Sequence, residues 1–201
     1  MLWWYNLDER IYALREDAKK AGEPVLRDKS FLLLLEKVRE KKPVRILEIG
    51  VNRGLSGIAM LLESQKSLLT GIEIDEDKIK IAKENYKTFG VESRAKIFQG
   101  DASEIIPVLT GEYDFIFLDG PKGHYYEYLP NLLTVLSVGG ILFADNVLFR
   151  GYVNDKVKTP RRFNTTKHSM EKFIAEITNS DSLKTEIIDI EDGISITEKL
   201  K

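Results

Sequence analysis

The sequence predicts one domain of the α/β class, a doubly wound and mostly parallel sheet with helices on both faces. From about residue 44 onward, short apolar segments typical of buried strands alternate with amphipathic segments typical of helices, as in parallel strands joined by right-handed crossovers. The last two strand segments are separated only by the turn Glu191–Gly193, so they should pair antiparallel. No repeat, low-complexity tract or linker divides the 201 residues, and a chain of this length buries enough surface to fold as a single domain, residues 1–201.

Seven strands and the helices between them follow in order. The first 42 residues predict two helices, because apolar side chains recur at helical spacing at Ile11, Leu14 and Ala18 and again near residues 31–38. We expect Trp3 and Trp4 to pack against the domain or a partner subunit. Strands are expected at 44–49, 67–74, 95–98, 113–118, 140–144, 184–190 and 194–197. Further helices are expected at 54–63, 75–89, from 102, 125–136 and 166–177.

Composition narrows the class of protein. The chain is 43% hydrophobic and 31% charged with a net charge of −2, so no overall charge draws it to nucleic acid. The absence of cysteine excludes disulfides and thiolate sites, and two histidines are too few for a histidine-rich metal cage. The longest apolar run, Phe31–Leu35, is far shorter than the ~20 residues of a membrane span, and the first residues lack the pattern of a signal peptide. We therefore expect a cytoplasmic protein without membrane association.

Two of the expected strands end in oxygen-bearing side chains. Asp119 follows the strand at 113–118, and Asp145 with Asn146 follows the strand at 140–144. Neighbouring parallel strands lie only ~4.8 Å apart, so one divalent cation could touch all three side chains. Two carboxylates and one amide favour Mg²⁺, or another hard divalent cation such as Ca²⁺ or Mn²⁺, over zinc. An enzyme is therefore the leading hypothesis.

The turn after the first strand predicts a ligand site, because doubly wound sheets bind ligands beyond the carboxyl ends of their strands. Gly50 would allow a tight turn, and Gly54 would begin a helix whose N-terminal N–H groups favour an anionic group. A tight turn between strand and helix explains these glycines almost as well. Their spacing differs from the G-x-G-x-x-G fingerprint, which disfavours an NAD-dependent dehydrogenase.

Acidic residues follow the second and third strands. Glu73 and Asp75 lie on one strand face, about 20 residues past the glycine-rich turn, where a ribose diol is held. We prefer Glu73, since Asp75 could cap the next helix. Asp101, followed by Ala102, lies at the next strand-to-helix turn, where it could reach an adenine or equally serve as a helix cap.

Together these motifs resemble the cation-dependent O-methyltransferases, the family that includes catechol and caffeoyl-CoA O-methyltransferases. The resemblance runs from about residue 23 to the last residue of the sequence. Its motifs are Ile46–Gly50, Gly71–Glu73, Gly100–Ala102, Tyr113–Asp119 with Lys122, and Asp145–Asn146. Within the family, the chain is most similar to the bacterial tRNA 5-hydroxyuridine methyltransferases, at residues 145–153, 160–162 and 192–196.

The resemblance implies a Rossmann-like methyltransferase fold, S-adenosylmethionine as methyl donor, a homodimer, and N-terminal helices (residues 1–42) that cover the active site. It implies Mg²⁺ or a similar cation held by Asp119, Asp145 and Asn146. Lys122, one turn past Asp119 and near this cation, could accept the proton of the acceptor hydroxyl, so we expect Asp119 and Lys122 as the catalytic residues; the alternative for Lys122 is an ordinary surface lysine. The donor site would be formed by Leu26, Glu48, Gly50, Ser56, Glu73, Asp101, Ala102 and Asp119. The chain departs from the family at Val51–Arg53 and at Gly120–Pro121.

A basic segment follows Asn146 and contains Asp155 as its single acid up to residue 168. Such a run is usually a solvated face, but its position beside the expected cation indicates a role with the acceptor. The residues that could neutralise the phosphates of a tRNA anticodon stem-loop are Arg150, Lys156, Lys158, Arg161 and Arg162. Phe149, Tyr152 and Phe163 could stack on a splayed base or could anchor the loop, and for Phe149 we prefer the anchor.

The predicted reaction is methylation of the 5-hydroxyl of 5-hydroxyuridine at the wobble position of tRNA, which yields 5-methoxyuridine. A 5-hydroxyuracil carries neighbouring oxygens on C5 and C4, much as a catechol carries two hydroxyls, so both could chelate one cation. A small catechol-like phenol is therefore an alternative acceptor. A non-catalytic module that binds S-adenosylmethionine or RNA is a third reading, although such a module needs no cation.

Overall fold

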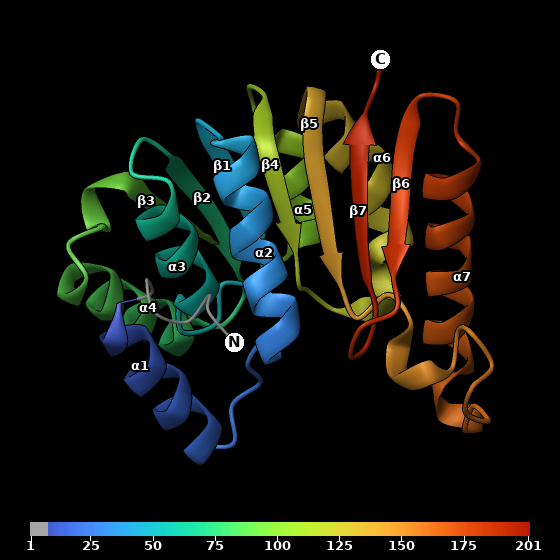
Figure 1. Cartoon of the computed structure of the whole chain (residues 1–201), viewed down its shortest axis with the longest axis horizontal. Helices are drawn as coiled ribbons and strands as arrows, with labels where there is room; N and C mark the ends of the chain where they lie inside the picture. The colour runs from blue at the N-terminus through green and yellow to red at the C-terminus, as the bar shows by residue number, and fades with distance from the viewer. Residues whose placement is uncertain (1–7) are drawn as a thin grey trace.

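A seven-stranded sheet runs through the computed structural model, which describes residues 8–201 (Figure 1). The strands are β1 (Arg45–Ile49), β2 (Leu68–Glu73), β3 (Ala95–Gln99), β4 (Tyr113–Leu118), β5 (Leu136–Asp145), β6 (Leu183–Ile188) and β7 (Ile194–Lys199). Their order across the sheet is β3-β2-β1-β4-β5-β7-β6. Strand β7 runs antiparallel to both of its neighbours, β5 and β6, and the other neighbouring strands pair parallel. The predicted mixed, doubly wound sheet is confirmed.

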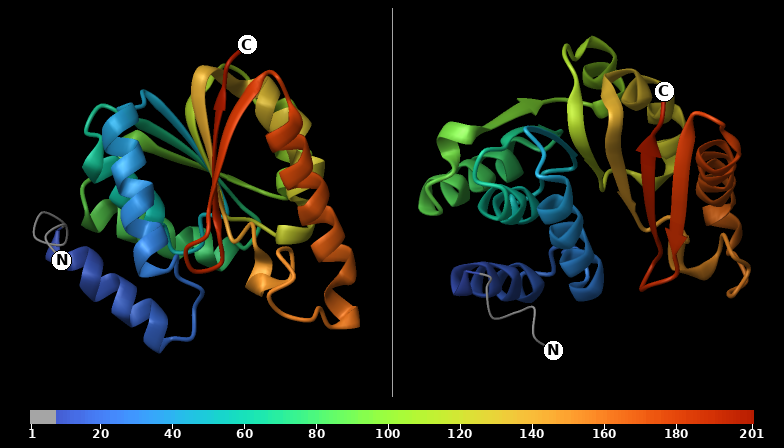
Figure 2. Two further views of the ribbon diagram at one scale, coloured as in Figure 1. Left: turned by 45° about the vertical axis from the view of Figure 1, so that its right-hand side comes forward. Right: turned by 45° about the horizontal axis from the view of Figure 1, so that its top comes forward.

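Helices cover both faces of this sheet (Figure 2). They are α1 (Glu9–Lys20), α2 (Asp28–Lys41), α3 (Leu55–Glu63), α4 (Glu76–Thr88), α5 (Ala102–Ile105), α6 (Tyr125–Val135) and α7 (Asn164–Asn179). Successive strand residues point to opposite faces, so Phe115 and Phe117 join the core beneath α2 and α3. Ile116 and Leu118 join the second core, beneath α6 and α7. The apolar runs predicted for the central strands are thus explained by burial on both sides.

The structure corrects the start of the fifth strand. Residues 125–136 were expected as helix and 140–144 as strand, whereas α6 ends at Val135 and β5 begins directly at Leu136. Leu136 pairs with Tyr113, and the register then shifts before Phe115 pairs with Ile141. The pair Gly139–Gly140 resembles a turn in the sequence, but here it lies within a strand that bends.

The N-terminal helices are confirmed as α1 and α2, and polar contacts connect them with each other and with the rest of the fold. Arg15 is buried, donates to the Leu26 carbonyl at 2.8 Å and pairs with Asp28 at 2.8 Å. Glu191, from the turn between β6 and β7, accepts hydrogen bonds from the N–H groups of Lys29 and Ser30. This distant carboxylate caps α2, whose own N-cap residue provides no side-chain bond.

Two sequence expectations concern the chain outside the sheet. Trp3 and Trp4 lie outside the described residues. Within residues 8–201, no helix has both the length and the apolar character needed to cross a membrane.

Candidate active site

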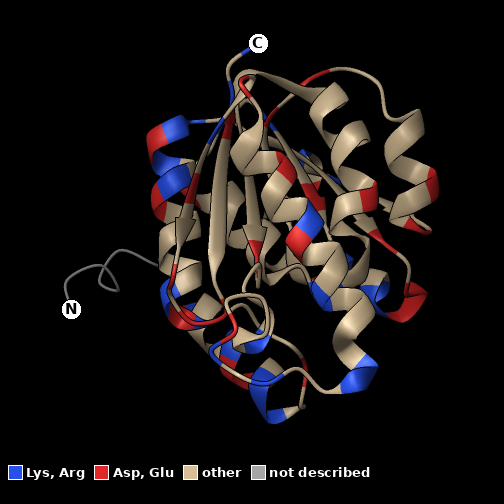
Figure 3. Ribbon diagram, turned by 90° about the vertical axis from the view of Figure 1, so that its right-hand side faces the viewer, with Lys and Arg blue, Asp and Glu red and all other residues tan. Residues whose placement is uncertain are grey.

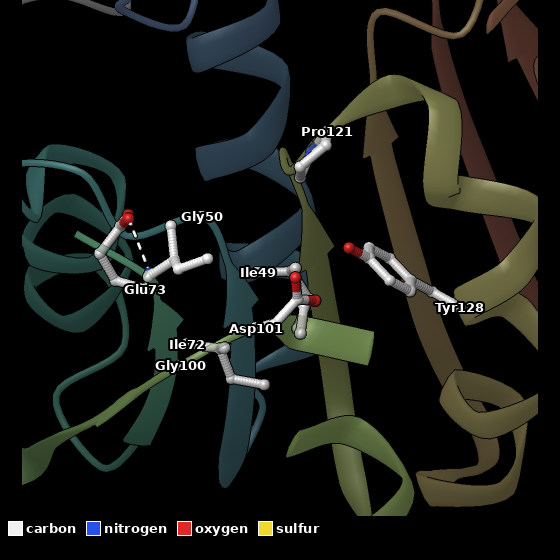
Figure 4. Close-up of a pocket in the computed structure, with 10 residues that line it drawn as sticks. Ile49, Gly50, Ile72, Glu73, Gly100, Asp101, Pro121 and Tyr128 are labelled. Atoms are coloured by element: carbon white, nitrogen blue, oxygen red, sulfur yellow. Dashed lines mark hydrogen bonds between the residues drawn. The ribbon is translucent and has the colours of Figure 1, made fainter. Parts of the chain in front are cut away.

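The candidate site lies at the carboxyl ends of β1, β2, β4 and β5, where the strand order reverses between β1 and β4. A cavity of about 490 Å³ opens there, which we call the donor cavity. The sequence-predicted residues in its wall are Leu26, Gly50, Ser56, Glu73, Asp119 and Lys122. A smaller cavity shares Gly50 and Glu73 with it and adds Asp101 and Ala102 (Figure 4). All the predicted donor residues except Glu48 therefore border one of two adjoining cavities.

Gly50 brings the tips of β1 and β4 together. Its φ is +91°, a conformation that only glycine adopts readily. A side chain at this position would begin 2.6 Å from the Asp119 carbonyl oxygen, so any larger residue would displace Asp119. The glycine predicted for a tight turn is therefore also required by close approach to the opposite strand.

Glu73 and Asp75 have separate roles in the structure. Glu73 Oε2 accepts from the Asn52 N–H at 2.7 Å, and Oε1 accepts from the N–H groups of Ile74 and Asp75. Asp75 accepts from the N–H groups of Asp77 and Lys78 and caps α4. The expected helix cap is confirmed, and contact between Glu73 and a ribose remains a prediction.

The smaller cavity combines an acid with an aromatic side chain that the sequence analysis missed. Asp101 caps α5 through the Ser103 N–H, and hydrogen bonds from Ser103 lower its pKa. Tyr128 of α6 points its hydroxyl toward the middle of this cavity (Figure 4). Burial, with the nearby Asp101 charge, raises the pKa of Tyr128 to about 12, so this hydroxyl stays protonated and can donate a hydrogen bond.

Asp119 and Asp145 extend from matching positions on neighbouring parallel strands. Leu118 pairs with Ala144 in the register of β4 and β5, so the next residues, the two aspartates, share one face of the sheet. Tyr125 donates to both the Leu118 and the Asp145 carbonyl oxygens, at 3.0 and 3.2 Å, and braces the two strand tips. The aspartates that the sequence predicted to meet are adjacent.

The ionised form of Asp145 is disfavoured by burial and by the neighbouring Asp119. Asp145 is only 4% exposed. Burial, followed by repulsion from Asp119, raises its pKa to about 7. Lys122 Nζ pairs with Asp119 Oδ1 at 2.7 Å, whereas Asp145 has no ion pair within residues 8–201. When both carboxylates are ionised, the single ammonium group of Lys122 leaves a net negative charge, which would favour binding of a cation.

Asn146 follows directly, with a backbone φ of +59°. Its side-chain amide forms no hydrogen bond within the described part of the chain. That part also contains no group of three or more His, Cys, Asp or Glu residues placed for a metal ion, so a cation here would depend on the two carboxylates and this amide. All three donors are oxygens, which fits a hard divalent cation.

Glu48 lies beneath the donor cavity instead of in its wall. Its side chain is fully buried, and within residues 8–201 neither carboxyl oxygen has a hydrogen-bond partner of good geometry, although the Gly57 N–H lies close enough to lower its pKa slightly. Burial, and then repulsion from Asp119 and Glu73, raises its pKa well above the ordinary value. Direct contact between Glu48 and a donor remains a prediction, and the geometry favours an indirect influence.

Replacing Glu48 with glutamine should change how stability depends on pH. Between the ordinary pKa and the raised one, the folded protein keeps a proton that the unfolded chain has released, so the free energy of unfolding falls as pH rises. Relative to the unmodified protein, Glu48→Gln should become more stable as pH is raised from about 5 to about 8, with a slope of at most about 1.4 kcal/mol per pH unit. Chemical denaturation at both pH values measures this gain, with the exposed Glu104→Gln as control. Parallel pH profiles for the Glu48 variant and the unmodified protein would contradict the expectation.

The basic segment forms the loop between β5 and α7. All five predicted RNA-binding residues are exposed. Lys156 pairs with Asp189 at 2.5 Å, while the other four form no ion pair with any described residue. Lys and Arg positions gather with acidic ones at the end of the molecule where this loop lies (Figure 3).

The three aromatic side chains of this loop pack on one another. Ring centroids are 5.4 Å apart for Phe149 and Tyr152, 5.6 Å for Phe149 and Phe163, and 5.7 Å for Tyr152 and Phe163. Arg150 and Arg162 lie over the Phe163 ring. The three rings therefore pack on one another within the loop, and both the anchor preferred for Phe149 and stacking on a base remain predictions.

The strand order, the antiparallel seventh strand and the cavity at the switch point together define a Rossmann-like methyltransferase fold. The O-methyltransferase family matches residues 12–200, so the chain belongs to that family. It is 32% identical to the catechol O-methyltransferase of Niastella koreensis over 173 residues, which cover 78% of this chain and 77% of that protein. It is 30% identical to the caffeoyl-CoA O-methyltransferase of Populus kitakamiensis over 211 residues, covering 96% and 87%.

A solved structure of a methyltransferase has a similar fold. The S-adenosylhomocysteine-bound methyltransferase PaMTH1 of Podospora anserina has a TM-score of 0.80 and 26% identity, over 96% of this chain and 86% of that one. The chain is an S-adenosylmethionine-dependent O-methyltransferase of the caffeoyl-CoA and catechol type.

Proposed function

We propose that this protein transfers a methyl group from S-adenosylmethionine to one of two neighbouring oxygens on its acceptor, with the help of a hard divalent cation. The observation that carries the proposal is the register of β4 and β5, which brings Asp119 and Asp145 together beside the donor cavity. A protein that only binds the donor has no use for a buried, unpaired aspartate at this point.

Asp119, Asp145 and Asn146 would hold the cation, and Mg²⁺ fits their oxygens. When bound, the cation would supply positive charge that favours the ionised form of the acceptor hydroxyl and fixes its orientation. Asp145 would contribute a buried charge with no competing ammonium partner, while Asp119 is shared with Lys122. This difference makes Asp145 the ligand whose removal is easiest to interpret.

The donor cavity would hold S-adenosylmethionine. Glu73 would accept hydrogen bonds from ribose hydroxyls. Backbone N–H groups at the cavity wall fix the orientation of its carboxylate, and a carboxylate can accept more than these bonds. Asp101, Ala102 and Tyr128 would surround the adenine in the smaller cavity. Leu26 and Ser56 would border the methionine portion, with Asp119 at the reacting end.

Methyl transfer to a hydroxyl oxygen breaks the bond between sulfur and methyl carbon, forms the bond between methyl carbon and oxygen, and releases the hydroxyl proton. As a neutral amine, Lys122 would accept that proton, because its Nζ lies in the cavity wall, 2.7 Å from Asp119 Oδ1. Holding both reactants in line would supply much of the remaining rate enhancement.

For the acceptor, we propose 5-hydroxyuridine at the wobble position of a tRNA anticodon, with 5-methoxyuridine as product. The support is the exposed basic loop that begins four residues after Asn146, where Arg150, Lys158, Arg161 and Arg162 form no ion pair with any described residue. Mass spectrometry of tRNA nucleosides from cells with and without the protein tests this. Unchanged 5-methoxyuridine in cells without the protein would contradict it.

A small catechol-like phenol is an equally supported acceptor. Its support is the similarity to the catechol O-methyltransferase of Niastella koreensis, together with the same need for two neighbouring oxygens. An activity panel distinguishes the two acceptors. Methylation of free catechols without methylation of hydroxyuridine-containing tRNA would favour the phenol.

Removing two arginines from the basic loop should weaken binding to an anticodon stem-loop RNA. Arg161→Ala with Arg162→Ala removes two exposed charges, so the slope of log affinity against log salt concentration should become shallower by about 1 to 2. Fluorescence anisotropy at several salt concentrations measures both effects, with Lys66→Ala and Lys83→Ala, two exposed lysines outside this loop, as control. Equal RNA affinity for both double variants would refute the assignment.

The cytoplasmic location expected from the composition and the homodimer implied by the family resemblance remain predictions.

A further inference from the structure

The segment that joins α1 and α2, residues Glu23–Leu26, forms part of the wall of the donor cavity. We call this segment the strap. A second cavity, also of about 490 Å³, borders the strap and is lined by Lys19, Arg27, Asp28 and Glu191 as well. With open space on two sides, the strap depends on a few specific contacts to stay in place.

An ion pair connects the start of the strap to α4. Lys78 Nζ pairs with Glu23 Oε1, and their side chains are only 23% and 22% exposed. Next in the strap, the Pro24 carbonyl accepts from the Asn52 side-chain amide at 3.2 Å. Both partners belong to the donor cavity wall, so the strap is attached to the same elements that would hold the donor.

Lys78 occupies a position near the N-terminus of α4, where an acidic residue would stabilise the helix better than a lysine. It lies in the first turn of α4, directly after Glu76 and Asp77, and the positive end of the helix dipole disfavours a cation there. Its own N–H donates to the cap residue Asp75. Local helix stability therefore does not explain this lysine, whereas pairing with Glu23, 55 residues earlier, does.

Glu23 is held rigidly for this contact. Its N–H donates to the Ala18 carbonyl at 3.0 Å, and the Gly22 N–H donates to Lys19, which closes the end of α1. The other end of α1 also reaches α4, because Arg10 donates to the Thr88 carbonyl and lies over Phe89. Helix α1 thus spans α4, and the Glu23–Lys78 pair closes this span at the donor cavity.

We propose that the Glu23–Lys78 ion pair is a latch that holds the strap across the donor cavity and slows the release of the donor and its product. Both are positioning residues, since they act through the strap. The inference rests on the donor cavity of the proposed function, but on neither the acceptor nor the cation.

The test measures dissociation of S-adenosylhomocysteine by stopped-flow displacement, using Lys78→Glu, Glu23→Lys and the exchanged double variant. Each single variant should release the ligand about fivefold faster, the effect of a typical partly exposed ion pair. The double variant should return the rate to within about twofold of the unmodified protein, because it restores the pair in reverse.

Lys80→Glu is the matched control. Lys80 lies in the same helix, is 63% exposed and, among residues 8–201, pairs only with Glu76 and Asp77. The Lys80→Glu substitution therefore introduces the same charge change away from the strap. S-adenosylhomocysteine carries no sulfonium charge, which limits long-range effects of these substitutions. Unchanged release in the single variants, or faster release that the exchanged pair does not restore, would overturn the latch alone. Failure of the unmodified protein to bind S-adenosylhomocysteine would overturn the donor cavity together with the latch.

Discussion

Replacing Asp145 with asparagine is expected to lower the rate of methyl transfer by at least about 100-fold while S-adenosylhomocysteine binds as before. The substitution keeps the size of the side chain but removes the carboxylate of Asp145, a residue that is only 4% exposed. Asp145 lies outside the wall of the donor cavity, so donor affinity should survive. Initial rates over a range of Mg²⁺ concentrations, with calorimetric titration of S-adenosylhomocysteine, measure both quantities.

A matched control separates this effect from a general loss of negative charge. Asp181→Asn removes an exposed carboxylate just before β6 and should leave turnover unchanged. If Asp145→Asn turned over normally at every Mg²⁺ concentration, the cation would have no part in the reaction. If it also lost S-adenosylhomocysteine binding, the substitution would have disturbed the donor cavity, and Asp145 could not be assigned to the cation alone.

Replacing Lys122 with methionine should lower the turnover number by about 10²- to 10⁴-fold, the usual contribution of a positioned proton acceptor. Methionine keeps much of the apolar stem but cannot accept a proton. The deficit should shrink at high pH, where more of the acceptor hydroxyl is already ionised in solution. Turnover measured as a function of pH, at saturating acceptor, checks both expectations.

Lys122→Arg distinguishes proton transfer from simple charge pairing. Arginine can keep the ion pair with Asp119, seen at 2.7 Å for the lysine, but it remains protonated at any working pH. Loss of turnover in both variants supports proton transfer, whereas normal turnover in Lys122→Arg would show that only the positive charge matters. Lys66→Met, at an exposed lysine between α3 and β2, is the control.

Most of the fold follows from local patterns. The alternation of apolar runs with helical spacing located all seven strands and the major helices, because burial on both faces makes central strands continuously apolar. The start of β5 was misplaced because Gly139 and Gly140 form a bend within a strand, and a glycine pair has no local mark that separates a bend from a turn. Tyr128 and Tyr125 were missed as site residues for a similar reason, since buried tyrosines in α6 look like ordinary core residues in the sequence.

The sequence by itself determined which chemical groups stand at the ends of the strands: an acid as the last residue of β2 and of β5 or directly after β4, and a glycine directly after β1. Parallel strands place their carboxyl ends at one edge, so these residues had to meet. Tertiary structure alone decided which acidic side chains are buried, such as Glu48 and Asp145. It also decided which distant groups pair: Glu23 with Lys78, and Glu191 with the start of α2. Burial and such long-range pairs depend on how whole elements pack, and no short stretch of sequence encodes that packing.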